Sequence, residues 1–317
     1  MLVRDIAHSL DTAVFPGLEA LRDAYGWGPR THRIFDRLFG LKSTSLHPDQ
    51  RLEDGLRASA TKLALRHACL QGQVDLIVYC HALNTTLAFE DAVLRRIGRD
   101  VFGSAAEVMS VTHGSCASAL LLLHLLVRYP AGAARNIVLL TGEKCFFELL
   151  DYADNNGIFG ETTSAVWLTA AGEGPVVARV TATVGGAFDG VSAPLARADN
   201  ETLARYDRDF LPTMQAAVKT ALDRAGLQPA QIDTILPTHL SPFTFNRIAD
   251  RLGIPEGRVV KQNLAQIGHC FCGDLFINLE TWARDAAPQP DPVHILSFAA
   301  GMTGSYAAII LTKEPRP

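Results

Sequence analysis

The sequence lacks the features that would place it on a membrane or on nucleic acid. It has 29 lysine and arginine residues against 33 aspartate and glutamate residues, a net charge of −4, so it offers no excess of positive charge to a polyanion. The longest apolar run, residues 117–127, is interrupted by Ser118 and His124 and is too short to cross a bilayer. The first five residues do not have the charged-then-apolar layout of a signal peptide. These absences predict a cytoplasmic protein that binds neither nucleic acid nor membrane.

Several common functional motifs are also missing. The 6 cysteines in 317 residues have no regular spacing, which argues against a disulfide framework. No phosphate-cradling loop of the P-loop or dinucleotide kind occurs, because Gly185-Gly186 lacks the glycine that should follow. The absence of a Gly-x-Ser-x-Gly elbow disfavours a serine hydrolase. We therefore expect no nucleotide cofactor, and a chain of this length is expected to divide its core between two lobes.

Apolar runs of strand length alternate with helical patterns along the chain. Strands are predicted at residues 75–80, 136–142, 163–168, 176–184, 232–236, 294–298 and 306–311, and helices at 51–71, 89–97, 209–225, 243–252 and 273–284. This alternation predicts an α/β protein with a largely parallel core. Residues 1–60 mix short helical patterns with turns and are predicted to form an irregular cap.

Two strand pairs repeat at one spacing, which predicts a duplicated chain. The offset is 158 for both pairs, residues 75–78 with 233–236 (233 − 75) and 136–139 with 294–297 (294 − 136). The halves are expected to span residues 1–172 and 173–317, with the boundary at a Gly-Glu-Gly-Pro turn that begins at Gly172. The same offset pairs Cys116 with Asp274, so two helix starts are expected to meet where the halves join.

A cysteine stands at the start of the most apolar helix in the sequence. Residues 114–119 form a turn of small residues around Cys116, and the leucine-rich residues 120–127 follow. A helix that is apolar on all sides belongs in a core, and the positive end of its dipole favours a thiolate at its start. A cysteine in such a helix is more often a small hydrophobic residue. Its place at the helix start, and the partners found elsewhere in the chain, favour a nucleophile.

Two histidines are candidates to activate that thiol. His239 follows a predicted strand, at the end where α/β sheets place their ligands, and His269 lies in a glycine-flanked loop before a helix. An imidazole can act as the base or the cation that a thiolate nucleophile needs. The backbone amides of a glycine turn at Gly301 can hold a developing oxyanion.

Each of these residues also has a plainer interpretation. With 10 histidines in the chain, a histidine at the end of a strand is unremarkable. His269 and the two cysteines after it are only half of a zinc ligand set, so no metal is predicted. Asp274 can simply cap its helix, and His113 can merely line a pocket. His124, inside the apolar helix, is expected to be a satisfied core residue.

Taken together, these segments resemble the thiolase-fold condensing enzymes and, within them, the ketoacyl synthase III type. The likeness covers most of the chain, and the order and spacing of its segments are more specific than any one of them. The segments are the nucleophile turn at 114–119, the strand at 136–143, residues 158–165 with Glu161 in place of the usual Asp, the His239 segment continued at 247–255, and the loop at 297–305.

The resemblance implies a thiolase-like duplicated α/β/α/β/α five-layer fold, usually assembled as a homodimer. It implies that Cys116 accepts an acyl group from acyl-CoA or an acyl carrier protein, that His239 is the first catalytic imidazole, and that the amides of Cys116 and Gly301 form an oxyanion hole. His269 stands where ketoacyl synthase III enzymes have an asparagine, which helps to stabilise the enolate of a malonyl thioester. We expect a catalytic role for His269, and we expect the acyl group to be transferred to an acceptor other than the malonyl thioester that ketoacyl synthase III enzymes use.

The altered position predicts a specialised biosynthetic enzyme. We expect an acyltransferase that hands the acyl group on Cys116 to an acceptor other than a malonyl thioester, with Phe147 and Phe271 limiting the acyl chain and Asp274 in a supporting place. The alternatives are decarboxylative Claisen condensation, a cysteine-dependent thioesterase and a non-catalytic partner subunit. The presence of both Cys116 and His239 disfavours the last of these.

Overall fold

The strands of the chain pair into one long sheet. The computed structural model describes the 317 residues apart from 84–86, 88, 129–135, 145–151, 154–156, 173–174, 192–194, 196–197, 240–241, 287–290 and 316–317. The strands are β1 (Leu2–His8), β2 (Leu76–Cys80), β3 (Glu107–Val111), β4 (Ile137–Thr141), β7 (Ser164–Thr169), β8 (Ala178–Ala187), β9 (Thr234–Ile235), β10 (Val293–Ala300) and β11 (Ser305–Lys313). Their order in the sheet is β3-β2-β4-β7-β1-β8-β11-β10-β9. Two short strands, β5 (Tyr152–Ala153) and β6 (Gly157–Ile158), form a separate pair.

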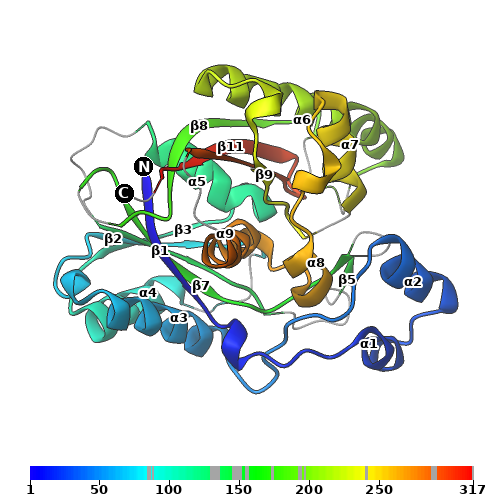
Figure 1. Cartoon of the computed structure of the whole chain (residues 1–317). Coiled ribbons are helices and arrows are strands. Elements are labelled where there is room, and N and C mark those ends of the chain that lie inside the picture. Colours follow the sequence, from blue (N-terminus) through cyan, green and yellow to red (C-terminus); the bar gives the residue numbers. More distant parts are fainter. Residues whose placement is uncertain are drawn as a thin grey trace.

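The helices lie on both faces of this sheet and between its two halves. They are α1 (Leu18–Tyr25), α2 (Pro29–Arg33), α3 (Leu52–Arg66), α4 (Glu90–Phe102), α5 (Ser118–Leu126), α6 (Asn200–Ala225), α7 (Pro242–Leu252), α8 (Gln262–Ile267) and α9 (Asp274–Asp285). Figure 1 shows α3 and α4 under one half of the sheet, α5 and α9 in the middle, and α6 and α7 over the other half. The predicted five-layer α/β/α/β/α arrangement is confirmed.

The sheet is mixed, so the prediction of a largely parallel core is wrong. In the described part of the chain β2 pairs in parallel with β3 and β4, and β10 with β9, whereas the other neighbours are antiparallel. A tight turn at Gly301–Gly304 reverses the chain between β10 and β11. A connection this short can join only antiparallel strands. A run of buried apolar residues therefore indicates burial on both faces, and does not reveal strand direction.

Two strands of the long sheet and the short pair β5 and β6 were not predicted from the sequence, and the helices α4 and α6 are longer than predicted. β1 lies within the predicted cap and pairs with both β7 and β8. β3 forms the sheet edge with residues that are partly exposed, including Met109, so it lacks the apolar run of a buried strand. α6 begins at Asn200, where Asp199 caps it by accepting from the Thr202 amide at 2.7 Å, and it continues past Pro212.

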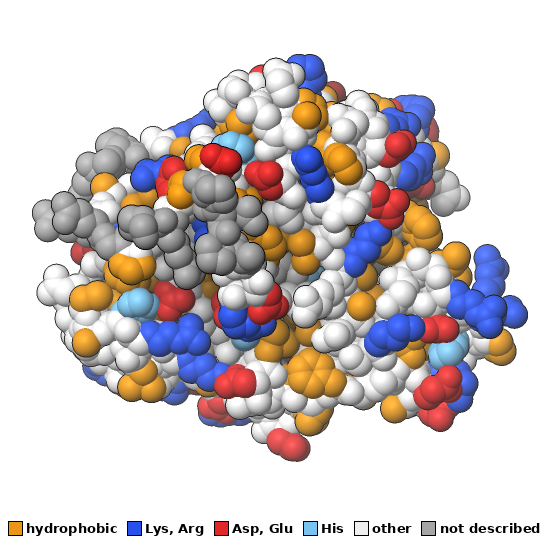
Figure 2. Space-filling view, in the orientation of Figure 1, with side chains coloured by type: hydrophobic (Ala, Val, Ile, Leu, Met, Phe, Trp, Pro, Cys, Tyr) orange, Lys and Arg blue, Asp and Glu red, His pale blue; other side chains and the backbone are white. Residues whose placement is uncertain are grey.

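The surface mixes charges of both signs. Lysine and arginine side chains alternate with aspartate and glutamate over the face seen in Figure 2. This distribution agrees with the near-neutral composition and gives that face no single-sign field. Among the described helices none is long and apolar enough to span a bilayer.

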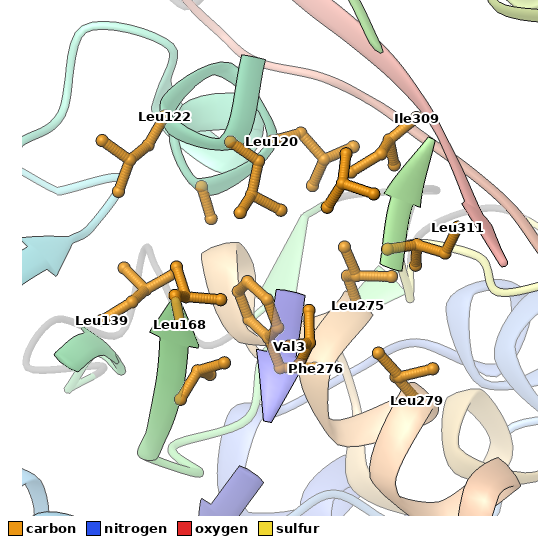
Figure 3. Close-up of a cluster of buried hydrophobic side chains, with 14 of the residues drawn as sticks. Val3, Leu120, Leu122, Leu139, Leu168, Leu275, Phe276, Leu279, Ile309 and Leu311 are labelled. Atoms are coloured by element: carbon orange, nitrogen blue, oxygen red, sulfur yellow. The ribbon is translucent and has the colours of Figure 1, made fainter. Parts of the chain in front are cut away.

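The core between the two sheet halves positions the ends of α5 and α9. Both helices are buried along most of their length, as the apolar pattern of α5 predicts. Figure 3 shows their side chains packed against the flanking strands: Leu120, Leu122, Leu275, Phe276 and Leu279 from the helices, and Val3, Leu139, Leu168, Ile309 and Leu311 from the strands. Each such side chain contributes about 1.5–3 kcal/mol by burial, so the helix starts are fixed by the most stable part of the molecule.

The two central helices begin in the same way, which supports a duplication, although their offset differs from the offset of 158 that the paired strands keep. A 3₁₀ turn, Ser115–Ala117, precedes α5, and a second one, Phe271–Gly273, precedes α9. The offset between them is 156 (271 − 115), so the counterpart of Cys116 is Cys272. The predicted pairing of Cys116 with Asp274 is therefore wrong by two residues. The boundary at residues 172 and 173 stays a prediction, and residues 173–174 lie outside the described residues.

Candidate active site

The turn that carries Cys116 is tightly built. Ser115, directly before the cysteine, has a φ of 49°, a left-handed conformation that a non-glycine residue adopts only when the surroundings hold it. Cys116 follows in the 3₁₀ turn, with 6% of its surface exposed, and α5 begins at Ser118. The amides of Ser115 and Ala117 donate to Thr112 O at 2.9 Å and to Gly114 O at 3.0 Å, which leaves the amide of Cys116 as the candidate anion donor of this turn.

A second loop brings His269 to this turn. The backbone of His269 is clamped between two residues of the 158–160 segment, since its N–H donates to Ile158 O at 2.7 Å and its carbonyl accepts from Gly160 N at 2.9 Å. Gly268, just before it, has φ 69° and ψ −172°, a conformation that only glycine adopts readily. A side chain there would also meet the Thr44 hydroxyl at 2.3 Å. The segment at 158–165 that contributes to the family resemblance thus positions the histidine.

Cys116, His269 and Asp274 form a line of three hydrogen-bonded groups. The Nε2 atom of His269 lies 3.2 Å from the sulfur of Cys116, and its Nδ1 donates to Oδ2 of Asp274 at 2.6 Å. Both His269 and Asp274 are fully buried. The carboxylate is held from its other side by the amide of Cys270, which donates to Oδ1 at 2.7 Å. This is the arrangement of nucleophile, base and orienting carboxylate that activates a weak nucleophile.

The charges in this line support one another. Burial pushes the pKa of His269 down, but the charges of Asp274 and Cys116 outweigh it and raise that pKa to about 10. Burial would likewise raise the pKa of Asp274, yet the charges of His239 and His269 hold it below its usual value. The geometry therefore favours a protonated His269, an imidazolium held between the carboxylate of Asp274 and the sulfur of Cys116.

His239 lies beside the carboxylate and turns its ring away from the sulfur. Its backbone N–H donates to Oδ2 of Asp274 at 2.6 Å, and its ring is fully buried. Nδ1 lies 2.8 Å from the carbonyl oxygen of Gly268, and Nε2 lies 2.9 Å from Oδ1 of Asn278. The structure thus brings His239 into the cluster through Asp274, and its catalytic role stays a prediction.

The two donors predicted for an oxyanion hole lie on turns that pack against each other. Gly301 packs directly on the nucleophile turn, since a Cβ at this position would lie 1.9 Å from Gly114 O. The Gly301 amide itself donates to Ser305 O at 2.8 Å in the turn between β10 and β11. The amide of Cys116 lies at the opening of its own 3₁₀ turn. Both donors remain predictions, and the amide of Gly301 would have to leave Ser305 to bind an oxyanion.

Aromatic side chains line the cysteine. Phe159 and Phe271 form one buried cluster with Cys116, and their ring centroids are 4.8 Å apart. Ala82 and Leu83 pack against this cluster. Phe271 was predicted near the pocket, whereas Phe159 was not singled out, although it lies in the segment that holds His269. Phe159 is placed near the site by an isolated β-bridge to His269. A single β-bridge between residues far apart in the chain produces no sequence pattern from which it could be predicted.

The remaining predicted residues fall in different places. The ring of His113 is exposed, and its carbonyl accepts from the Thr303 hydroxyl at 2.9 Å. His124 is buried and its Nδ1 lies 2.9 Å from the Thr183 hydroxyl, as expected of a core histidine. Phe147 lies outside the described residues. Glu161 is buried and accepts from Lys144 Nζ at 2.7 Å, so it ties its segment to the rest of the fold.

The other buried thiols near the site are inert. Burial raises the pKa of Cys270 to about 12 and that of Cys272 well above its usual value, so both stay protonated. Cys272 donates to Ser115 O at 3.3 Å and so links the two 3₁₀ turns. Within the described residues no group of three or more histidine, cysteine, aspartate or glutamate side chains is arranged to hold a metal ion.

Replacing Gly301 by alanine is expected to distort the nucleophile turn. The added Cβ would overlap the carbonyl of Gly114, so the backbone must shift. Overpacking of this kind costs about 1–3 kcal/mol of unfolding free energy, and acylation of Cys116 should slow with it. Urea unfolding and acylation rates measure both effects. Gly257→Ala is the matched control, because a Cβ there meets nothing within 4 Å. Equal behaviour of the two variants would show that Gly301 does not support the turn.

Comparison with known proteins finds ketoacyl synthase III enzymes in sequence and in structure. Residues 222–312 match the family model described as the C-terminal part of 3-oxoacyl-[acyl-carrier-protein] synthase III. A β-ketoacyl-[acyl-carrier-protein] synthase III of Streptomyces lividans is 23% identical over 312 residues, which cover 91% of this chain and 89% of that protein. One from Pseudomonas aeruginosa is 27% identical over 188 residues, 54% of this chain and 57% of that protein.

Solved structures share the fold over the whole chain. ChlB3, described as an acyltransferase, superposes with a TM-score of 0.82 at 14% identity and covers 100% of this chain and 98% of its own. The 3-oxoacyl-(acyl carrier protein) synthase III of Pseudomonas aeruginosa PAO1 has a TM-score of 0.75 at 17% identity, with 99% and 98% covered. The tetronic acid condensing enzyme AbyA1 gives 0.73 at 17%, with 98% and 99% covered. The chain thus has the fold of the ketoacyl synthase III structures, and its residues 222–312 match the family model of their C-terminal part.

Proposed function

We propose that the protein transfers an acyl group from acyl-CoA or an acyl carrier protein, through a thioester on Cys116, to the hydroxyl or amine of an acceptor in a specialised biosynthetic pathway. The observation that carries this proposal is the line from Cys116 through His269 to Asp274, with separations of 3.2 Å and 2.6 Å. A base that is oriented by a carboxylate suits both removal of a proton from an acceptor and activation of the thiol.

The charges give His269 a different task in each half of the reaction. The thiolate of Cys116 attacks the donor thioester carbonyl, the tetrahedral intermediate collapses, and His269 gives its proton to the departing thiol. Acylation removes the negative charge of Cys116, one of the two charges that raise the pKa of His269. The pKa of the imidazole falls as a result, and the deprotonated ring can act as a base. It takes the proton of the acceptor, which attacks the acyl thioester and releases Cys116 as a thiolate.

The direction of the two imidazoles supports transfer to an acceptor over decarboxylation. An enolate formed from a malonyl thioester needs donors that converge on its oxygen. Of the two imidazoles, that of His269 lies within hydrogen-bond distance of Cys116, while the ring of His239 is bonded to Gly268 and Asn278. The similarity of fold to an acyltransferase, ChlB3, also supports the proposal. A homodimer and a cytoplasmic location are further parts of it.

Intact-protein mass spectrometry after incubation with acyl thioesters tests the proposal. We expect a mass gain of one acyl group on the wild type and none on Cys116→Ala. Cys69→Ala, at an exposed free cysteine, is the matched control and should gain the same mass as the wild type. A gain on Cys116→Ala, or none on any protein with any donor, would reject an acyl-Cys116 intermediate. Rapid loss of the acyl group to water without an acceptor would identify a thioesterase.

Decarboxylative condensation is the second candidate, because proteins described as ketoacyl synthases and a condensing enzyme share the fold. Malonyl thioester supplied to the acylated protein separates the two functions. We expect no release of carbon dioxide above that of Cys116→Ala. Release at the rate of product formation would establish condensation in place of transfer to oxygen or nitrogen.

A further inference from the structure

We infer that His239 is a positioning residue held as an imidazolium cation, and that His269 alone exchanges protons with Cys116 and the substrates. The part of this inference that concerns catalysis rests on the proposed function, whereas the proton count rests on hydrogen-bond geometry. A buried imidazole whose two nitrogens both face oxygen acceptors needs a proton on each of them. The two nitrogens of His239 are in that position.

The Nδ1 side is settled by a backbone group. Nδ1 of His239 lies 2.8 Å from the carbonyl oxygen of Gly268, and a carbonyl oxygen can only accept. An unprotonated Nδ1 at this distance would place its lone pair against a lone pair of the Gly268 carbonyl oxygen, in a fully buried position. Nδ1 therefore carries a proton, and that proton fixes the loop that begins at Gly268 and presents His269.

The Nε2 side is settled by the orientation of Asn278. Its Oδ1 lies 2.9 Å from Nε2 of His239, and its Nδ2 donates to Pro237 O at 2.8 Å. Oδ1 also accepts from Nδ2 of Asn263 at 3.1 Å. Rotating the Asn278 amide by half a turn would place its Oδ1 next to the carbonyl oxygen of Pro237. It would also place its Nδ2 next to Nδ2 of Asn263, so that two donors would face each other. Nε2 of His239 therefore faces an acceptor and carries the second proton.

The charge of Asp274 favours this cation. Asp274 is the anion that contacts His239, with Oδ1 3.3 Å from Nδ1 and Oδ2 accepting its backbone N–H, and His269 lies on the other side of the same carboxylate. A positive charge on His239 lies beside this buried carboxylate and lowers the cost of burying it.

This proton count decides what His239 can do. An imidazolium has no lone pair with which to remove a proton. The Nε2–H group of His239 already donates a hydrogen bond to Oδ1 of Asn278. The residue instead pairs with the carboxylate of Asp274 and holds the loop at Gly268 through a hydrogen bond to its carbonyl oxygen. It acts on the reaction through His269.

Nitrogen-15 NMR of the imidazole rings in the wild-type protein tests the proton count without any substrate. We expect both nitrogens of one buried histidine, assigned by its loss in His239→Gln, to remain protonated from about pH 6 to pH 9. In the same spectra, the pH at which His269 loses its proton should be higher in His239→Gln, because a neighbouring positive charge is gone. A His239 ring with one bare nitrogen near neutral pH would overturn the inference.

The variants give an independent kinetic reading. His239→Gln keeps one donor and is expected to slow acylation of Cys116 by less than about 10-fold, whereas His269→Gln should slow it by at least about 100-fold. His67→Gln, whose ring pairs with Asp5 outside this cluster, is the control and should leave the rate unchanged. Equal losses in the first two variants would contradict a positioning role. If the wild type is never acylated, the proposed function is rejected. The number of protons on His239 is then tested by the NMR spectra alone.

Discussion

Asp274→Asn is expected to lower kcat/KM for acyl transfer by about 10³- to 10⁴-fold, because a neutral amide cannot hold the His269 imidazole in the required tautomer. The carboxylate accepts from Nδ1 of His269 at 2.6 Å and from the amides of His239 and Cys270. An asparagine can offer its single oxygen to one side of this set and must present its NH₂ to the other. The imidazole then loses the negative charge that raises its pKa.

Steady-state kinetics with a donor identified by mass provide the measurement. Asp285→Asn is the matched control, since Asp285 ends the same helix α9 at the surface and pairs there with Arg284. The control should stay within about 0.5 kcal/mol of the wild type in unfolding free energy and keep its activity. If Asp274→Asn also kept wild-type kcat/KM, the carboxylate would be a helix cap without a part in catalysis.

The sequence was sufficient to predict the layers and the place of Cys116 at the start of a buried helix. The apolar residues around α5 indicate a buried helix whatever their partners are, and a cysteine at the start of such a helix is a local feature. Strand direction was not predicted correctly, because it depends on connections such as the turn at Gly301. β1 and β3 were missed for a related reason. β1 lies in a segment dominated by turn signals, and β3 is an edge strand with exposed side chains.

The site was predictable as a set of residues and not as a geometry. Asp274 was placed near the cysteine by the repeat, yet its position at a helix start also has the simpler meaning of a cap. Its place in the line with Cys116 depends on His269, which is positioned by the bridge to Phe159 and by the backbone of Gly268. The direction of the His239 ring depends on Asn278, a residue 39 positions away that no motif marks. Such side-chain directions arise only from tertiary packing.

The pair of His269 and Asp274 should also give the unfolding free energy a characteristic pH dependence. The pKa of His269 is raised to about 10, above its unfolded value, so its contribution is complete below that unfolded value and is lost as the pH rises through about 10. The pKa of Asp274 is lowered, so its contribution is complete above the unfolded value and is lost as the pH falls through the lower folded value. The pair therefore contributes most between the unfolded pKa of Asp274 and that of His269, in mildly acid solution, and its contribution declines above that range.

Urea unfolding of the wild type and of Asp274→Asn at a series of pH values tests this. Breaking a buried charged pair costs about 3–5 kcal/mol, so the two proteins should differ by roughly that amount in mildly acid solution. The difference should shrink toward pH 10, where His269 loses its proton, and shrink again in stronger acid, where Asp274 gains one. Asp285→Asn should follow the wild type throughout, because its carboxylate is exposed. A difference that is independent of pH would mean that Asp274 stabilises the fold through its backbone hydrogen bonds and not through its charge.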